Sequence, residues 1–269
     1  MRLIPILLLA ASTFVLPAAA KEAGQAPKAA PAADGKAAGG TAKVENEVQY
    51  ERCMLLARQD PSQGLNEALA WESMGGGEAA RHCGAIALVG LRQYDKAARR
   101  LEDLAAESQS SAKLRAGMLA QAGQAWLLAG DPERAFAAQT KALNLVPGAP
   151  DLLVDRAESL AEQKKYKEAL ADLDQALAAA PNRVDALTFR GTAKRFLDDR
   201  KGAEIDIAKA LSIDPNYQDA WLESGILKRL AGNDVEARQA WSKVLEIAPH
   251  SAAADSARRD IELLDGKSR

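Results

Sequence analysis

The side chains that could do chemistry are few, and the two cysteines are the most informative of them. Cys53 and Cys83 are far apart in the sequence, and the only histidines are His82 and His250. Thiol–disulfide exchange catalysts hold their cysteines close together as Cys-X-X-Cys, so that the attacking thiol has a lowered pKa and a resolving partner beside it. The wide spacing here disfavours a thiol oxidoreductase and leaves three roles open: a structural disulfide, two free thiols, or a metal site that includes His82.

Other catalytic signals are weaker still. No Gly-X-Ser-X-Gly nucleophile motif occurs, and Gly75–Gly77 is not followed by the Lys and Ser or Thr of a phosphate-binding loop. The 37 acidic residues permit many carboxylate pairs, but no pair stands out by its position. We therefore predict a protein that is not an enzyme and that has no cofactor and no metal site.

Composition favours an all-helical fold. The chain has 269 residues, of which 48% are apolar and only 4% aromatic, and alanine and leucine dominate. The 35 basic residues nearly balance the 37 acidic residues, so no polybasic surface is available for nucleic acid. Nucleic acid is not an expected partner.

The N-terminus has the pattern of an export signal. Arg2 precedes an apolar stretch, Leu3–Leu16, and the small residues Ala18–Ala20 suit signal peptidase. The alternative is a retained membrane anchor, but this stretch is shorter than the roughly 20 residues that span a bilayer. We predict a signal peptide at 1–20, a disordered Ala/Pro/Gly/Lys linker at 21–43, and a soluble periplasmic protein with no stable membrane span.

A period of 34 residues runs through the rest of the chain. Successive prolines are 34 residues apart: Pro147, Pro181, Pro215, Pro249. So are the alanines that close the break before each second helix: Ala135, Ala169, Ala203, Ala237. If each unit ends two residues after its proline, the units are 116–149, 150–183, 184–217 and 218–251. Proline lacks an amide hydrogen and pushes the preceding residue out of the α region, so each proline is expected to end a helix. Alanine lets two helices cross closely.

These residues resemble the tetratricopeptide repeat family, whose period is also 34. Gly123, Gly191 and Gly225 match its small position and Trp221 its aromatic one, whereas Arg156 and Arg190 stand where the family usually has a large apolar residue. The resemblance implies an all-α solenoid of stacked antiparallel helix pairs. We expect two divergent pairs at 44–115, the four repeats at 116–251, and a capping helix at 252–266.

In this family the first helices line a concave groove that holds a partner. The resemblance places these residues in it: Asp151, Val154, Glu158, Ala161, Asp185, Thr188, Thr192, Arg195, Asp219, Leu222, Ile226, Arg229. The family's clamp for a C-terminal carboxylate uses Lys and Asn, and the matching positions here carry Thr188, Thr192, Leu222 and Ile226. That clamp is therefore absent. Arg195 and Arg229 are expected to meet acidic groups of a partner, and Leu222 and Ile226 to offer an apolar contact.

The architecture also bears on the cysteines, because Cys53 and Cys83 fall on first helices that stack side by side in such an array. In an oxidising compartment we expect a structural disulfide between them. The function predicted is a non-catalytic protein–protein interaction scaffold of the bacterial envelope. The alternatives are a self-associating structural component and, less favoured, a thiol oxidoreductase.

Overall fold

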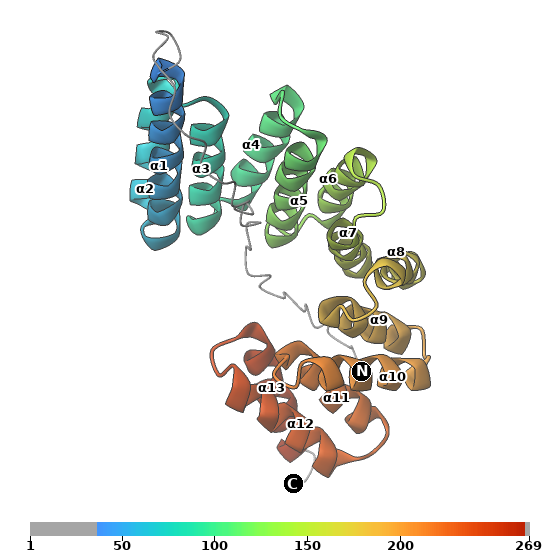
Figure 1. Ribbon diagram of the computed structural model, residues 1–269. Coiled ribbons are helices and arrows are strands. Elements are labelled where there is room, and N and C mark those ends of the chain that lie inside the picture. The colour runs from blue at the N-terminus through green and yellow to red at the C-terminus, as the bar shows by residue number, and fades with distance from the viewer. Residues whose placement is uncertain (1–36, 267–269) are drawn as a thin grey trace, which may run out of the picture. The chain divides into compact units, whose positions relative to one another are not determined.

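A computed structural model of the chain describes residues 37–266, and this part contains thirteen α-helices and no strand (Figure 1). The predicted all-α class is therefore confirmed. The described residues form two compact units, which meet in sequence between Arg92 and Gln93. The predicted signal peptide at 1–20 lies outside the described residues. No helix among the described residues is long and apolar enough to cross a membrane.

The first unit contains α1 (Ala37–Gln59), α2 (Pro61–Ser73) and α3 (Gly77–Gly90), each packed against the other two. The sharp turn into α2 follows from Asp60, whose Oδ1 accepts a hydrogen bond from the Gln63 amide at 3.0 Å, and from proline at the first helical position. Because α1 begins at Ala37, residues 37–43 are helical, and the predicted linker is too long at that end.

The second unit consists of ten helices in a regular succession. Their bounds are α4 (Tyr94–Glu107), α5 (Ala112–Leu128), α6 (Pro132–Leu145), α7 (Pro150–Glu162), α8 (Tyr166–Ala179), α9 (Val184–Phe196), α10 (Arg200–Ile213), α11 (Gln218–Leu230), α12 (Asp234–Ile247) and α13 (Ala252–Gly266). The pairs α5–α6, α7–α8, α9–α10 and α11–α12 correspond to the four repeats, and each is closely packed.

The helix ends repeat with the period of the sequence. Each second helix, α6, α8, α10 and α12, ends two residues before a proline, as predicted. Each turn inside a pair contains one residue in the left-handed region, and these residues are also 34 apart: Gly130, Lys164, Asp198, Gly232. Glycine adopts this conformation without strain, whereas Lys164 and Asp198 must be held there by the flanking helices.

Small residues set the distance between the two helices of a pair. The four predicted alanines are fully buried: Ala135, Ala169, Ala203, Ala237. Gly225 on α11 faces α12, where an added Cβ would lie 2.2 Å from Nε1 of Trp241. Trp241 is itself buried and donates from Nε1 to the carbonyl oxygen of Leu222 at 3.2 Å. The indole therefore has little room to move away.

The last helix covers the end of the array. Ala253, Ala254, Ala257 and Leu264 of α13 are buried against the core that includes Val244 of α12. The predicted capping helix at 252–266 has the same bounds as α13.

Gly225→Ala should lower the free energy of unfolding of the second unit by about 2 kcal/mol, because the new methyl group overlaps the buried Trp241 ring. Urea unfolding followed by circular dichroism would measure the change. Gly117→Ala on α5 is the matched control, since nothing lies within 4 Å of the Cβ it adds. The control should gain about 0.5–1 kcal/mol from reduced flexibility of the unfolded chain. Equal effects of the two substitutions would contradict this account of helix spacing.

Candidate functional site

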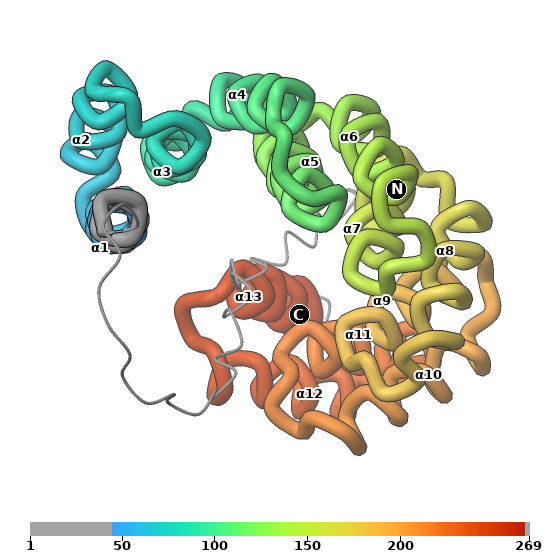
Figure 2. Tube along the Cα trace, turned by 45° about the horizontal axis from the view of Figure 1, so that its top comes forward, coloured from blue at the N-terminus to red at the C-terminus, as the bar shows by residue number. Residues whose placement is uncertain are grey.

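The first helices of the second unit lie along one side of it. α5 packs against α7, α7 against α9, α9 against α11, and α11 against α13, in addition to the contacts within pairs. Figure 2 shows α5, α7, α9 and α11 on the inner side of the curve that this unit follows, with α6, α8, α10 and α12 outside. We call the solvent-facing side of α7, α9 and α11 the inner face.

The residues predicted to contact a partner lie on α9 and α11 as expected, but they differ greatly in exposure. Thr188 and Thr192 are buried, and the hydroxyl of Thr188 donates to the carbonyl of Val184 at 2.9 Å. Leu222 has no exposed surface, because it packs in the core with Trp241. The prediction that Leu222 offers an apolar contact to a partner is therefore wrong.

Arg195 has an internal ionic role. Its guanidinium on α9 contacts both carboxylate oxygens of Glu223 on α11, with Nη2 at 3.2 Å from Oε2. Glu223 is 0% exposed. A buried carboxylate without its cation is strongly destabilising, so Arg195 holds two consecutive repeats together. The expectation that Arg195 is free to meet acidic groups of a partner is not supported by this pairing.

Asp185 is also used internally. Nε of Arg183 donates to its Oδ1 at 2.8 Å, and the same guanidinium contacts Asp151 on α7. Arg229 on α11 has Nη1 at 3.9 Å from Asp234, and this nitrogen is buried without a hydrogen-bond acceptor. Ile226 is partly exposed.

A different set of acidic side chains forms no ion pair with any described cation, although the charge of Arg183 acts on one of them, Asp155. Asp155 and Glu158 on α7 are one turn apart, and each accepts a hydrogen bond from the side-chain amide of Gln124 on α5, at 3.0 and 3.2 Å. Glu158 is 7% exposed, whereas Asp155 is partly exposed. Asp219, in the first turn of α11, is 8% exposed, and its carboxylate forms no hydrogen bond or ion pair with a described residue. We call Asp155, Glu158 and Asp219 the acidic cluster.

Burial controls the protonation of this cluster. Loss of solvation raises the pKa of Asp155 to about 7, that of Glu158 to about 8 and that of Asp219 to about 6. Repulsion from the charges of Asp155 and Asp219 raises the pKa of Glu158 further. Burial, together with the charges of Asp219 and two other acids, also raises the pKa of the Tyr217 phenol, just before α11.

The repeat register predicted the inward position of Glu158 and Asp219 but missed Asp155. A signal was available, because four acids on α7 fall at intervals of four, three and four residues and so share one helical stripe: Asp151, Asp155, Glu158, Glu162. Among the described residues, no group of three or more His, Cys, Asp or Glu side chains is placed to hold a metal ion.

Comparison with solved structures identifies the fold. PilW, described as a widely conserved type IV pilus biogenesis factor, is 21% identical, with a TM-score of 0.62 over 79% of this chain and 97% of PilW. TTC0263, a thermophilic TPR protein of Thermus thermophilus, is 20% identical, with a TM-score of 0.58 over 70% of this chain and 98% of its own. The chain has the tetratricopeptide repeat (TPR) fold.

MamA has the same TPR arrangement, at 18% identity and a TM-score of 0.51 over 64% of this chain and 92% of MamA. No protein-family model matches the chain, and no curated protein matches it. The resemblance inferred from the 34-residue period is thus confirmed at the level of the fold.

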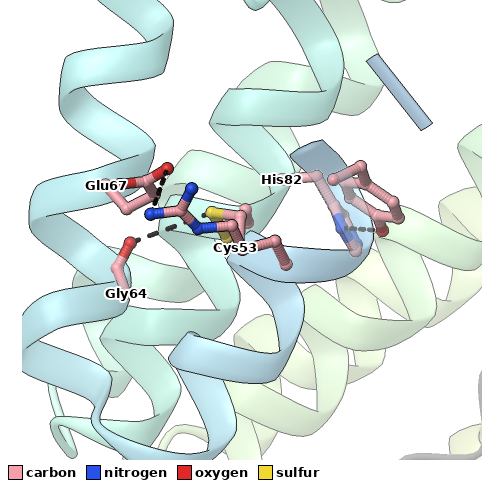
Figure 3. The surroundings of a disulfide bond; sticks show 7 residues. Cys53, Gly64, Glu67 and His82 are labelled. Carbon is pink, nitrogen blue, oxygen red and sulfur yellow. Dashed lines mark hydrogen bonds and ion pairs between the residues drawn. A yellow bond between two sulfur atoms is a disulfide. The ribbon is translucent and has the colours of Figure 1, made fainter. Parts of the chain in front are cut away.

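The structure also contains the predicted disulfide, in the unit that precedes the TPR pairs. Cys53 on α1 and Cys83 on α3 are bonded, with their Cα atoms 6.1 Å apart, and both are fully buried. Figure 3 shows the bond beside the backbone of Gly64 on α2. His82 lies nearby, where its Nδ1 is hydrogen-bonded to the hydroxyl of Tyr50 at 2.8 Å. Buried sulfurs are poorly placed for exchange with a second protein, which favours a structural role.

Replacing both cysteines with alanine should lower the stability of the first unit by about 3 kcal/mol, because the disulfide closes a loop of about 30 residues in the unfolded chain. Hydrogen exchange of α1–α3 would report the loss. The TPR pairs from α5 to α12 provide the internal control and should keep their protection. Unchanged exchange in α1–α3 would contradict a bracing role.

The acidic cluster should make the TPR unit less stable as the pH rises. Folding raises these pKa values above those of the unfolded chain, so the folded state binds more protons between about pH 4 and 8. The free energy of unfolding must then fall as the pH rises through this window. We expect a Tm at pH 8.5 at least about 5 °C below that at pH 5.5.

The variant Asp155→Asn/Glu158→Gln/Asp219→Asn should flatten this dependence, since the amides keep the shape of the side chains and do not ionise. Asp103→Asn on α4, an exposed acid, is the control and should leave the profile unchanged. Scanning calorimetry over the pH range measures both. If Tm changed with pH in the same way for the triple variant and the unmodified protein, the acidic cluster would not be the cause of the pH dependence.

Proposed function

We propose that this TPR protein is a non-catalytic scaffold of the bacterial cell envelope that binds a peptide or protein partner on the inner face of its second unit. The observation that carries the proposal is the polar character of that face. Helices that only packed together would bury apolar side chains, whereas α7 and α11 bury the carboxyl groups of Glu158 and Asp219 beside the partly exposed Asp155, with no ion pair to a described cation.

The proposed location rests on two features of the chain. The first twenty residues have the charge, apolar stretch and small residues of an export signal. The buried Cys53–Cys83 disulfide is of a kind that persists in an oxidising compartment. PilW, which has the same fold, is described as a pilus biogenesis factor, and a scaffold role in the envelope is compatible with that likeness.

Site-specific photocrosslinking in cells tests where the partner binds. A benzophenone amino acid would replace Ala161 on the inner side of α7 and, in a second strain, Ala171 on the outer side of α8. Both positions start from alanine in the same helix pair, and Ala171 is exposed. A discrete crosslinked product from position 161 and none from 171 is expected.

The same strains test export. The mature protein should be recovered from the periplasmic fraction with Lys21 as its first residue. Crosslinks from position 171 alone would move the binding face to the outer helices, and recovery from the cytoplasm with an intact N-terminus would overturn the envelope role.

A further inference from the structure

The buried carboxylates of the second unit fall into two groups. Those in the first group are bound to a cation of this chain: Asp172 (4% exposed) to Arg156, Asp206 (2% exposed) to Arg190 and Lys194, and Glu223 (0% exposed) to Arg195. Those in the second group, Glu158 (7% exposed) and Asp219 (8% exposed), are also buried and form no ion pair with a described cation. A buried carboxyl group is either paired with a cation or kept neutral by a proton, so pairing accounts for the first group, whereas the second has no cation of its own.

Within residues 37–266, no cation forms an ion pair with Glu158 or Asp219. The charged and titratable groups facing it are Asp151, Asp155, Glu158 and Glu162 of α7, Asp185 and Arg183 at the start of α9, and Tyr217 and Asp219 at the start of α11. Arg183 is the only cation among them, and its hydrogen bonds go to Asp185 and Asp151. From α5 comes only the neutral amide of Gln124.

The geometry limits the kind of cation that fits. A metal ion needs several oxygens within about 2.6 Å of one point, and no group of three or more such side chains is placed to hold one among the described residues. The acids instead come from two helices, α7 and α11, and the Asp219 carboxylate accepts no hydrogen bond from a described residue. An ammonium or guanidinium group carries three to five N–H donors and can bridge acids that a metal ion cannot.

The cluster reaches solvent mainly through one of its members. Asp155 is partly exposed, whereas Glu158 and Asp219 lie deeper. A long flexible side chain can pass Asp155 with its charged end leading and its methylene groups against the partly buried surface. A basic side chain of an extended segment meets these requirements.

We propose that the acidic cluster receives a lysine or arginine side chain of a protein partner, so that the inner face selects basic segments. This inference rests on the proposed scaffold function and specifies the chemistry of its ligand.

The proposal has a measurable proton linkage. The free cluster holds protons near neutral pH, because burial raises the pKa of Asp155 to about 7 and that of Glu158 to about 8. A bound cation favours the ionised carboxylates, so binding releases protons, and affinity must rise with pH until the free cluster is ionised. Exposed carboxylates, which ionise near pH 4, would give no such dependence between pH 6 and 8.

The experiment is a selection of random twelve-residue displayed peptides on three forms of the purified protein. These are the unmodified chain, the cluster variant Asp155→Asn/Glu158→Gln/Asp219→Asn, and the control variant Asp103→Asn/Glu168→Gln/Glu204→Gln. The control removes the same charge from exposed positions of α4, α8 and α10. Thermal melts confirm that all three are folded.

Peptides selected on the unmodified and control proteins should be enriched in Lys and Arg, and the enrichment should disappear on the cluster variant. Calorimetry with the tightest basic peptide should show affinity at least tenfold lower for the cluster variant at pH 7.5 and within twofold for the control. Its affinity for the unmodified protein should rise about tenfold from pH 6 to pH 8, with proton release detected in buffers of different ionisation enthalpy.

Four results would overturn the inference. If basic peptides bound the cluster variant as tightly as the unmodified protein, their binding would come from general surface charge and not from the acidic cluster. If the selected peptides lacked basic residues but competed with one another for the inner face, the scaffold function would be supported and the proposal of a basic ligand would be wrong. A synthetic peptide of residues 21–36 that binds the cluster more tightly than any selected peptide would make the occupant a segment of this chain. Failure to select any peptide on the inner face would count against the scaffold function as well.

Discussion

Close contact between the two helices of each pair is the constraint on which the rest of the second unit depends. The crossing points are occupied by alanines with no exposed surface, such as Ala169 and Ala203, and by glycines that face a side chain of the partner helix. A pair of helices this short cannot bury enough apolar surface by itself, so each first helix also packs against the next. That second set of contacts aligns α7, α9 and α11 and creates the inner face.

Within this frame, ionic pairs replace apolar contacts at two positions. Arg156 binds Asp172 through two hydrogen bonds, and one repeat later Arg190 binds Asp206 in the same way. The family usually places a large apolar residue where these arginines stand. Packing survives because the acid appears on the facing helix at the same interval in both repeats, so each buried charge has a fixed counter-charge. The acids of the acidic cluster have no such arginine on a facing helix. This difference separates the cluster from the structural ion pairs around it.

The sequence predicts contacts between residues of the same repeat better than contacts between residues of different repeats. The helix ends before Pro181 and Pro215 and the burial of Ala169 follow from local chemistry that recurs every 34 residues, and all were predictable. The role of Arg195 was not, because Glu223 lies in the next repeat and ordinary helix-end preferences also explain an arginine there. Leu222 sits at the inward register, yet its burial depends on Trp241 of the facing helix. Asp155 joins the acidic cluster through its hydrogen bond with Gln124, which comes from the preceding repeat.

The disulfide has a consequence for the topology of the first unit. The bond between Cys53 and Cys83 closes a ring of polypeptide that contains the whole of α2, from Pro61 to Ser73. A protease that cut the backbone within the turn at Met74 or Gly75 would therefore open the ring without producing two molecules. The two fragments of the cut chain would stay covalently linked until a reductant reached the sulfurs. Because both cysteines are fully buried, the surrounding helices would have to separate first.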